Sequence, residues 1–230
     1  MANFSVILLT ATPPGLAADI GGFFVKVDQR EILLRCVEMF LNRDNIKQVQ
    51  VVFAPEAMEE AKRKFYAHLS FTGVRMLTGG TTWLEQIIAA REKISPDTTH
   101  VVIHDAARPL LPWADLDALL EAAEKHEAVT LATPLRSGLI EVDPGGAPMA
   151  THLPSSYHIM QTPQVFSLAK YQEMCARKAE PHASQLHIVK GSPLNNRIGP
   201  PDASLARAIL NILPKAKSKP LTNPFEEAQW

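Results

Sequence analysis

The sequence contains few cysteines and carries almost no net charge. Its 230 residues include only Cys36 and Cys175, which form no C-x-x-C motif, so we expect buried thiols rather than a redox or metal pair. Lysine and arginine number 23, aspartate and glutamate number 24, and the net charge is -1. A protein that binds nucleic acid non-specifically needs a basic face, so this balance argues against a nucleic-acid partner.

Long apolar runs are also missing. No stretch is long enough to span a membrane, and residues 1–9 lack the basic start of a signal peptide. We therefore expect a cytoplasmic protein with no membrane partner. Hydrophobic residues make up 46% of the chain and charged residues 20%, which is typical of a globular protein. The length predicts a single domain over residues 1–230, large enough to bury a core without disulfides or metals.

Apolar runs alternate with segments of helical spacing along the chain. The runs predict strands at residues 5–11, 49–53, 74–77, 101–103, 128–135 and 186–189. Helices are predicted at residues 32–41, 55–69, 113–125, 168–177 and 202–213. A further helix starts after Thr81 or Thr82 and directs Leu84, Ile87 and Ile88 to the core. This alternation predicts an α/β fold with three layers, in which helices cover both faces of a mainly parallel, Rossmann-like sheet.

Two segments depart from this alternation. Residues 137–156 contain two short extended runs around the turn Asp143-Pro144-Gly145-Gly146, which predicts a hairpin that protrudes as a β-arm. As an alternative, the hairpin is only a surface excursion. Residues 214–230 contain several prolines and lysines, and we expect a loose tail there.

Residues 99–111, THVVIHDAARPLL, carry the strongest indication of function. The apolar run ends in His104, Asp105 and Arg108, and ligands of open α/β sheets bind beyond the carboxyl ends of the strands. Asp105 can hold a metal ion or a sugar hydroxyl, and the guanidinium of Arg108 suits a phosphate. Alternatively, the Asp–Arg pair only fixes a loop. His104 is expected to be a hydrogen-bonded core residue.

The string VVIHDAARPLL resembles the His-Asp-Ala-Ala-Arg-Pro signature of the 2-C-methyl-D-erythritol 4-phosphate cytidylyltransferases. YHIMQTPQVF, residues 157–166, resembles the family's Gln-Thr-Pro-Gln stretch. The resemblance implies that CTP, or another nucleoside triphosphate, and a sugar or polyol phosphate form a nucleotide-linked alcohol and pyrophosphate, with Mg²⁺ as cofactor. It also implies a homodimer in which the arm reaches the second subunit. The residues implied are Asp105, Arg108 and Arg197 for catalysis, Asp105 for the metal, and Thr162, Thr12, Gly79 and Gly80 for substrate binding. Lys26 is a further candidate for substrate binding, because it is the cation nearest to the first loop.

The first loop departs from the family. Members follow their first strand with an Ala-Ala-Gly-x-Gly-x-Arg-type run and later Pro-Lys-Gln, whereas this chain has no Lys or Arg before Lys26. Gly22 falls where the catalytic lysine belongs, and Pro13 and Pro14 remove N–H groups that can bind phosphate. Lys26 is either a substitute phosphate ligand or an ordinary solvated lysine. In the second loop, Trp83 either stacks on a base or packs in the core.

Three functional hypotheses follow. The first is a divergent nucleotidyltransferase that acts through Asp105, Arg108, Thr162 and Arg197. The second is a catalytically inactive paralogue that binds a metabolite or a protein, since the loss of two loop cations removes much of the charge stabilisation at the reacting phosphate. The third is the same fold with another nucleotide specificity.

Overall fold

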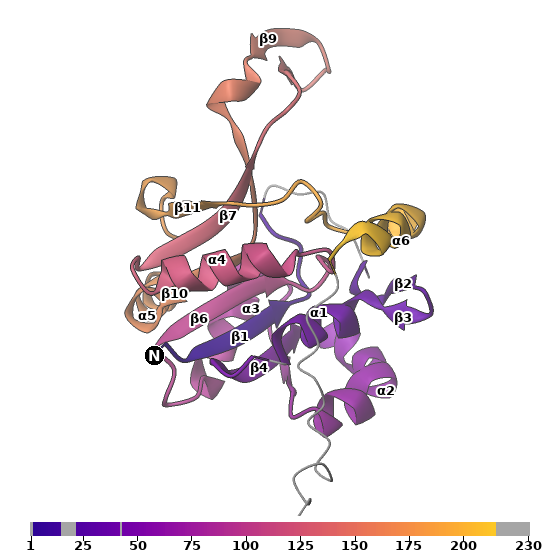
Figure 1. The fold of residues 1–230 in the computed structure, drawn as a ribbon, viewed down its shortest axis with the longest axis vertical. Helices are drawn as coiled ribbons and strands as arrows, with labels where there is room; N and C mark the ends of the chain where they lie inside the picture. Colours follow the sequence, from indigo (N-terminus) through magenta and orange to yellow (C-terminus); the bar gives the residue numbers. More distant parts are fainter. Residues whose placement is uncertain (1, 15–21, 42, 215–230) are drawn as a thin grey trace, which may run out of the picture.

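The computed structural model describes residues 2–14, 22–41 and 43–214. Within these ranges the centre of the molecule is a seven-stranded sheet with the strand order β11-β7-β10-β6-β1-β4-β5 (Figure 1). In chain order its strands are β1 (Phe4–Leu9), β4 (Ile46–Phe53), β5 (Arg75–Thr78), β6 (His100–Asp105), β7 (Ala128–Pro134), β10 (His158–Ser167) and β11 (His187–Lys190).

The sheet is mainly parallel, as the sequence predicts. β10 alone among these strands is antiparallel, and it lies between β6 and β7. The alternation pattern did not predict β10, because its first three residues are exposed, buried polar residues and Pro163 interrupt its apolar positions, and its register shifts between Gln161 and Gln164. The predicted α/β, three-layer fold is confirmed.

Helices cover both faces of the sheet, which explains the unbroken apolar runs of its strands. Along β1, Val6 and Leu8 point into one cluster of buried side chains, while Ile7 and Leu9 point into the other. The first cluster includes residues of α1, α2, α4 and α6, and the second includes residues of α3 and α5. The helices are α1 (Ile32–Leu41), α2 (Pro55–Phe71), α3 (Trp83–Ala90), α4 (Trp113–Ala123), α5 (Leu168–Arg177) and α6 (Ala203–Ile212).

The face that α3 buries differs from the prediction. Thr82 is the N-cap and forms a capping box with Glu85, so the helix begins at Trp83. Ile87 is buried as expected, but Leu84 and Ile88 are only half-buried. Trp83 and Gln86 are buried instead, and Gln86 reaches across to the loop after β1.

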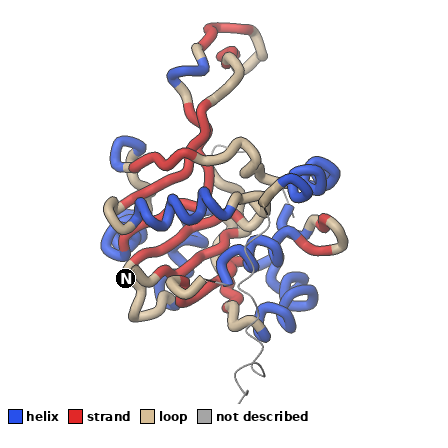
Figure 2. The backbone as a smooth tube through the Cα atoms, viewed as in Figure 1, coloured by secondary structure: helices blue, strands red, loops and turns tan. Residues whose placement is uncertain are grey.

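The predicted arm is present as a hairpin of β8 (Leu139–Val142) and β9 (Pro148–His152), which projects away from the sheet (Figures 1 and 2). His152 holds its two strands together by a 3.0 Å contact with Glu141, and Tyr157 at its base contacts the same imidazole at 3.1 Å. Large apolar side chains are exposed along it. They are Leu139, Ile140, Val142, Met149, Leu153, Tyr157, Ile159 and Met160.

A second small hairpin was not predicted. β2 (Lys26–Val27) and β3 (Arg30–Glu31) pair through a turn in which Asp28 and Gln29 both have positive φ, with Asp28 ion-paired to Arg207 of α6. Two-residue strands have no recognisable periodicity. The tail predicted from residue 214 onwards and the glycine-containing part of the first loop lie outside the described residues. None of the helices in the described ranges is long and apolar enough to cross a membrane.

Candidate functional site

The chain order reverses between β1 and β6. From β1 the chain fills β4 and β5 on one side, and it then crosses to β6 on the other side. The carboxyl ends of β1 and β6 meet there, with Leu9 paired to Asp105 and the Ala106 N–H bonded to the Leu9 carbonyl. Ligands of open α/β sheets bind at such a switch point.

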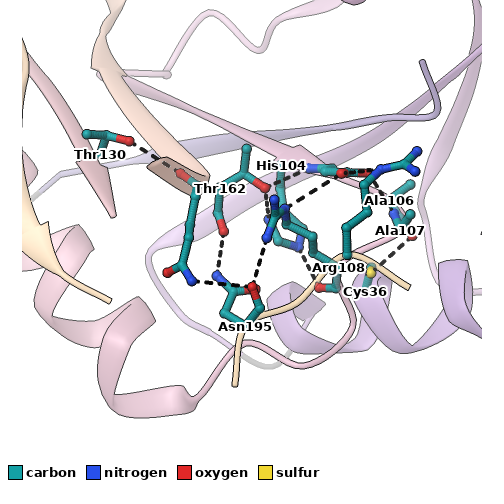
Figure 3. A network of polar contacts seen from close by, with 11 residues as sticks. Cys36, His104, Ala106, Ala107, Arg108, Thr130, Thr162 and Asn195 are labelled. Atoms are coloured by element: carbon teal, nitrogen blue, oxygen red, sulfur yellow. Dashed lines mark hydrogen bonds and ion pairs between the residues drawn. The ribbon is translucent and has the colours of Figure 1, made fainter. Parts of the chain in front are cut away.

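The three predicted catalytic residues lie together at this edge. Arg197 Nε is 3.0 Å from Asp105 Oδ2, and Arg108 Nε is 3.7 Å from the same oxygen. The Ala107 N–H donates to Asp105 Oδ1, and Arg108 Nη1 donates to the Asn195 carbonyl over 2.8 Å (Figure 3). The Asp–Arg pair therefore does fix its loop, and it also brings two guanidinium groups to one carboxylate.

The electrostatics of this cluster are set by burial. Asp105 is only 1% exposed, and burial raises the pKa of its carboxyl group, a shift that Arg197, the Ala107 N–H and Arg108 oppose. Burial also lowers the pKa of Arg108, against the attraction of Asp105. Two guanidinium groups, those of Arg108 and Arg197, therefore lie at one carboxylate. Guanidinium groups held in fixed positions are suited to binding a phosphate oxygen.

His104 and Thr162 connect β6 to β10 behind the cluster. His104 Nε2 lies 3.0 Å from the Arg108 carbonyl, which can only accept, so Nε2 carries the proton. Nδ1 therefore accepts from the Thr162 hydroxyl at 3.1 Å, and that oxygen accepts from the Asp105 N–H at 3.1 Å (Figure 3). Burial lowers the pKa of His104 to about 3, which keeps the ring neutral. His104 is thus the hydrogen-bonded core residue that the sequence predicts.

This network defines the position of Thr162. Its hydroxyl donates a hydrogen bond to His104, so Thr162 acts here as a positioning residue for the Asp105 loop. Direct binding of a substrate phosphate by this hydroxyl stays a prediction, and donation to a phosphate requires the hydroxyl to break its hydrogen bond to His104.

Asn195 and Gln161 extend the network, and the sequence analysis assigned neither a role. Asn195 Nδ2 donates to the Thr162 carbonyl, and Gln161 Nε2 donates to the Ser192 carbonyl. A Cβ at Gly191 would collide with Gln161 Oε1, so Gly191 is required by this packing. The available signal was the Gln161-Thr162-Pro163-Gln164 string, which singled out Thr162 alone.

The other predicted substrate-binding residues lie around the ends of β1 and β5. Thr12 lies three residues after the end of β1 and three residues before the undescribed part of the loop. At the end of β5, a Cβ at Gly79 would lie 2.5 Å from Val52 Cγ1, and one at Gly80 would collide with Glu85. Packing within the chain therefore requires both glycines. Reading of a base by these glycines stays a prediction.

Gln86 closes the space between these two loops. Its Oε1 accepts from the Thr10 and Ala11 N–H groups, each over 3.0 Å, and its Nε2 donates to the Gly80 carbonyl over 3.1 Å. The Thr10 N–H also lies 3.3 Å from the Val52 carbonyl of β4, so Thr10 still contacts the sheet while the Ala11 N–H bonds to Gln86. The sequence gives no sign of this role for Gln86, because its bonded partner Ala11 lies 75 residues away.

Lys26 and Trp83 have structural partners. Lys26 is 60% exposed and is ion-paired to Glu31, its cross-strand neighbour in the small hairpin. Within the described ranges, no hydrogen bond or ion pair links it to the Asp105 cluster. Trp83 is buried in the cluster beneath α3, which is the packing alternative. Gly22, which falls at the position of the family's lysine, is buried in a 3₁₀ turn (Gly22–Phe24).

The family model of 2-C-methyl-D-erythritol 4-phosphate cytidylyltransferase matches residues 6–212. The chain belongs to this family. A family member from Rhodopirellula baltica is 27% identical over 91% of this chain and 96% of its own length. One from Frankia casuarinae is 33% identical over 67% of this chain and 54% of its own length.

Solved structures show the same fold. The crystal structure of the cytidylyltransferase from Thermus thermophilus superposes with a TM-score of 0.70 at 23% identity, covering 90% of this chain and 98% of that one. A 4-diphosphocytidyl-2C-methyl-D-erythritol synthase gives 0.73 at 23% identity, covering 91% and 99%. The family resemblance and the fold that it implied are therefore confirmed.

The Mg²⁺ expected from the family meets a poor set of ligands at Asp105. Its Oδ2 faces two guanidinium groups and its Oδ1 accepts a peptide N–H, so a metal would have to displace an ion pair next to two positive charges. The described residues contain no group of three or more His, Cys, Asp or Glu side chains that could hold a metal. The residues described therefore do not fit a protein-held Mg²⁺ at Asp105.

Gly79→Ala tests the packing of the second loop. We expect it to lower the free energy of unfolding by about 1–3 kcal/mol, because the new methyl group must displace Val52 or α3. Urea unfolding measures the change. Gly138→Ala is the control, because its nearest neighbour would lie at 3.9 Å, and it should change stability by less than about 0.5 kcal/mol. Equal effects of the two changes would contradict the tight packing at Gly79.

The neutral His104 predicts a pH dependence of stability. Below its ordinary pKa of 6.5 the unfolded chain binds a proton at His104, whereas the folded protein binds none until about pH 3. Lowering the pH from 7 to 5 should therefore remove about 2 kcal/mol of stability through this group alone. Urea unfolding at the two pH values should show this loss shrink in His104→Gln. The exposed His158 provides the control, because His158→Gln should keep the whole loss.

Proposed function

We propose that this protein is a cytidylyltransferase that joins CTP to a sugar-alcohol phosphate, 2-C-methyl-D-erythritol 4-phosphate by family. A phosphate oxygen of the acceptor attacks the α-phosphorus of CTP and forms a new P–O bond. The bond from the α-phosphorus to the bridging oxygen breaks, and pyrophosphate leaves. The attacking oxygen is already ionised at neutral pH, so the protein needs no general base. It has to align two anions and stabilise their charge.

The observation that carries the proposal is the convergence of Arg108 and Arg197 on Asp105 at the switch point. The ion pairs hold both guanidinium groups in place before a substrate arrives, so little reorganisation is needed when a phosphate binds. The family comparisons support the same function, and the alternative of a catalytically inactive paralogue is not favoured by them.

The first loop sets the expected rate. No Lys or Arg precedes Lys26 in the sequence, so the β1 side of the site lacks the two family cations. One electrostatic donor contributes about 3 kcal/mol to such a barrier, so losing two predicts slow turnover. Mg²⁺ that arrives with the triphosphate would supply charge without a protein carboxylate, since Mg²⁺ in nucleotide sites is held largely by phosphates and water.

The arm supports a homodimer, and CTP as substrate fits a cytoplasmic location. The exposed apolar residues of β8 and β9 have no core of their own to pack against, and Figure 1 shows the hairpin standing clear of the sheet. Exposed apolar patches of this kind are typical of interfaces. A second copy of this chain is the partner that we propose, with the arm reaching its sheet.

Pyrophosphate release tests the function. Purified protein with CTP, Mg²⁺ and methylerythritol phosphate should release pyrophosphate, and Arg108→Ala should lower kcat/KM at least about 100-fold by removing one charge-stabilising group. Arg108→Lys should lose less, because it keeps the charge without the planar fork. Arg207→Ala, which removes an exposed ion pair on α6, is the matched control and should stay within about twofold of the wild type.

Two results would contradict the proposal. The first is full activity in Arg108→Ala. The second is silence of the wild type with every nucleoside triphosphate, together with no calorimetric heat on adding CTP.

Sedimentation tests the dimer. Ile140 and Met149 are 63% and 66% exposed on the arm, and Ile140→Asp with Met149→Asp should raise the dimer dissociation constant about 100-fold by burying charge in an apolar interface. Phe71→Asp changes a residue that is 91% exposed on α2, and it should leave the dimer intact. A monomeric wild type, or an arm variant that dimerises as tightly, would refute the role of the arm.

A further inference from the structure

Three backbone groups from two loops converge on the side-chain amide of Gln86. The Thr10 and Ala11 N–H groups donate to its Oε1, and its Nε2 donates to the Gly80 carbonyl. The Thr10 N–H has the Val52 carbonyl as a second acceptor at 3.3 Å. Nε2 also lies 3.5 Å from Thr10 Oγ1. The side chain is fully buried, so peptide groups of the protein replace water around the whole amide.

The three backbone groups around Gln86 have the donor and acceptor pattern of a binding site for the edge of a nucleotide base. Two N–H donors face an oxygen acceptor, and a carbonyl acceptor faces an NH₂ donor beside it. The edge of a cytosine presents the same two functions, an acceptor oxygen or ring nitrogen next to an exocyclic NH₂ group. The backbone groups of Thr10, Ala11 and Gly80 are therefore complementary to a base of this type, and Gln86 occupies their hydrogen bonds.

The position of this arrangement is that of a nucleotide site. Thr10 and Ala11 follow β1 at the switch point, and Gly80 follows β5 at the same edge of the sheet. Between the ends of β6 and β5 lie three strand spacings of about 4.8 Å, roughly 14 Å in all. A nucleotide extended along this edge from the arginine cluster would come to the N–H groups that Gln86 holds.

The protein gives Gln86 little freedom to leave. The capping box of Thr82 and Glu85 fixes the first turn of α3, which begins three residues before Gln86. Gly79 and Gly80 lie so close to Val52, Glu85 and Gln86 that the loop after β5 has no room for an added methyl group at either position. A ligand that uses the same N–H groups must displace a side chain that is both buried and fully hydrogen-bonded.

We propose that Gln86 suppresses selection of the nucleotide base by occupying the base-edge site formed by Thr10, Ala11 and Gly80. The base of a bound nucleotide then forms no hydrogen bond with these three backbone groups unless it displaces the side-chain amide of Gln86. This inference rests on the proposed function, because it assumes that a nucleoside triphosphate binds along this edge.

Calorimetric titration of CTP and of inorganic tripolyphosphate separates the base from the phosphates. The wild type should bind the two within about threefold of each other, because the base adds no hydrogen bond at this site. Gln86→Ser frees the Ala11 N–H and leaves the Thr10 N–H with the Val52 carbonyl alone, and it should tighten CTP about tenfold without changing tripolyphosphate. Gln50→Ser is the matched control, because Gln50 is equally buried but bonds to the Lys93 carbonyl, and it should behave as the wild type.

Amide hydrogen exchange gives a readout that needs no nucleotide. The Ala11 N–H should be protected in the wild type and exchange at least about tenfold faster in Gln86→Ser, which removes its acceptor. Gln86→Ala serves as a second variant with the same expectation, and circular dichroism checks that each variant is folded.

The outcomes separate the two proposals. Unchanged Ala11 exchange, or a wild type that prefers CTP over tripolyphosphate by more than tenfold and loses this preference in Gln86→Ser, overturns the role of Gln86 alone. If neither ligand binds to the wild type or to Gln86→Ser, both this inference and the proposed function fail.

Discussion

The buried carboxylate of Asp105 is the constraint on which this end of the sheet depends. A charge that is 1% exposed is costly unless its oxygens are paired, and here one oxygen takes the Ala107 N–H while the other takes Arg197 and Arg108. Because Arg197 lies 92 residues further along the chain, the ion pair forms only when β6 and the segment after β11 are both in place. Folding and assembly of the site are therefore the same event.

A network of neutral hydrogen bonds behind Asp105 connects its loop to the rest of the sheet. His104 joins the Arg108 carbonyl to Thr162, and Asn195 joins the Thr162 carbonyl to the segment that carries Arg197. β6, β10 and the loop after β11 are thereby connected through hydrogen bonds whose donors and acceptors are fixed. His104 keeps these roles over the whole physiological pH range because burial lowers its pKa to about 3.

The two sides of the switch point have diverged differently from the family. The β6 side keeps the Asp-x-x-Arg pair and a distant arginine, so two guanidinium groups are held at this edge of the sheet. On the β1 side the sequence has no cation before Lys26, and the N–H groups of Thr10 and Ala11 donate to Gln86. The described part of the loop after β1 is therefore bonded to an internal amide, whereas the loop after β6 carries Arg108.

The sequence by itself determined the fold class, most element positions and the importance of Asp105 and Arg108, because apolar periodicity and a strand-end motif are local properties of the chain. Helix α5 was predicted at its observed bounds, since Ser167 caps it and its apolar spacing is regular. Only the tertiary structure decided what depends on distant partners. Three features arise from contacts between segments far apart in the sequence: the antiparallel pairing of β10, the hydrogen bond from Thr162 to His104, and the bonding of Gln86 to the loop after β1. The ion pair of Lys26 with Glu31 depends on the small hairpin, which the sequence did not predict. The residue type at one position does not predict such a contact, because the interaction energy depends on both partners and on the fold that brings them together.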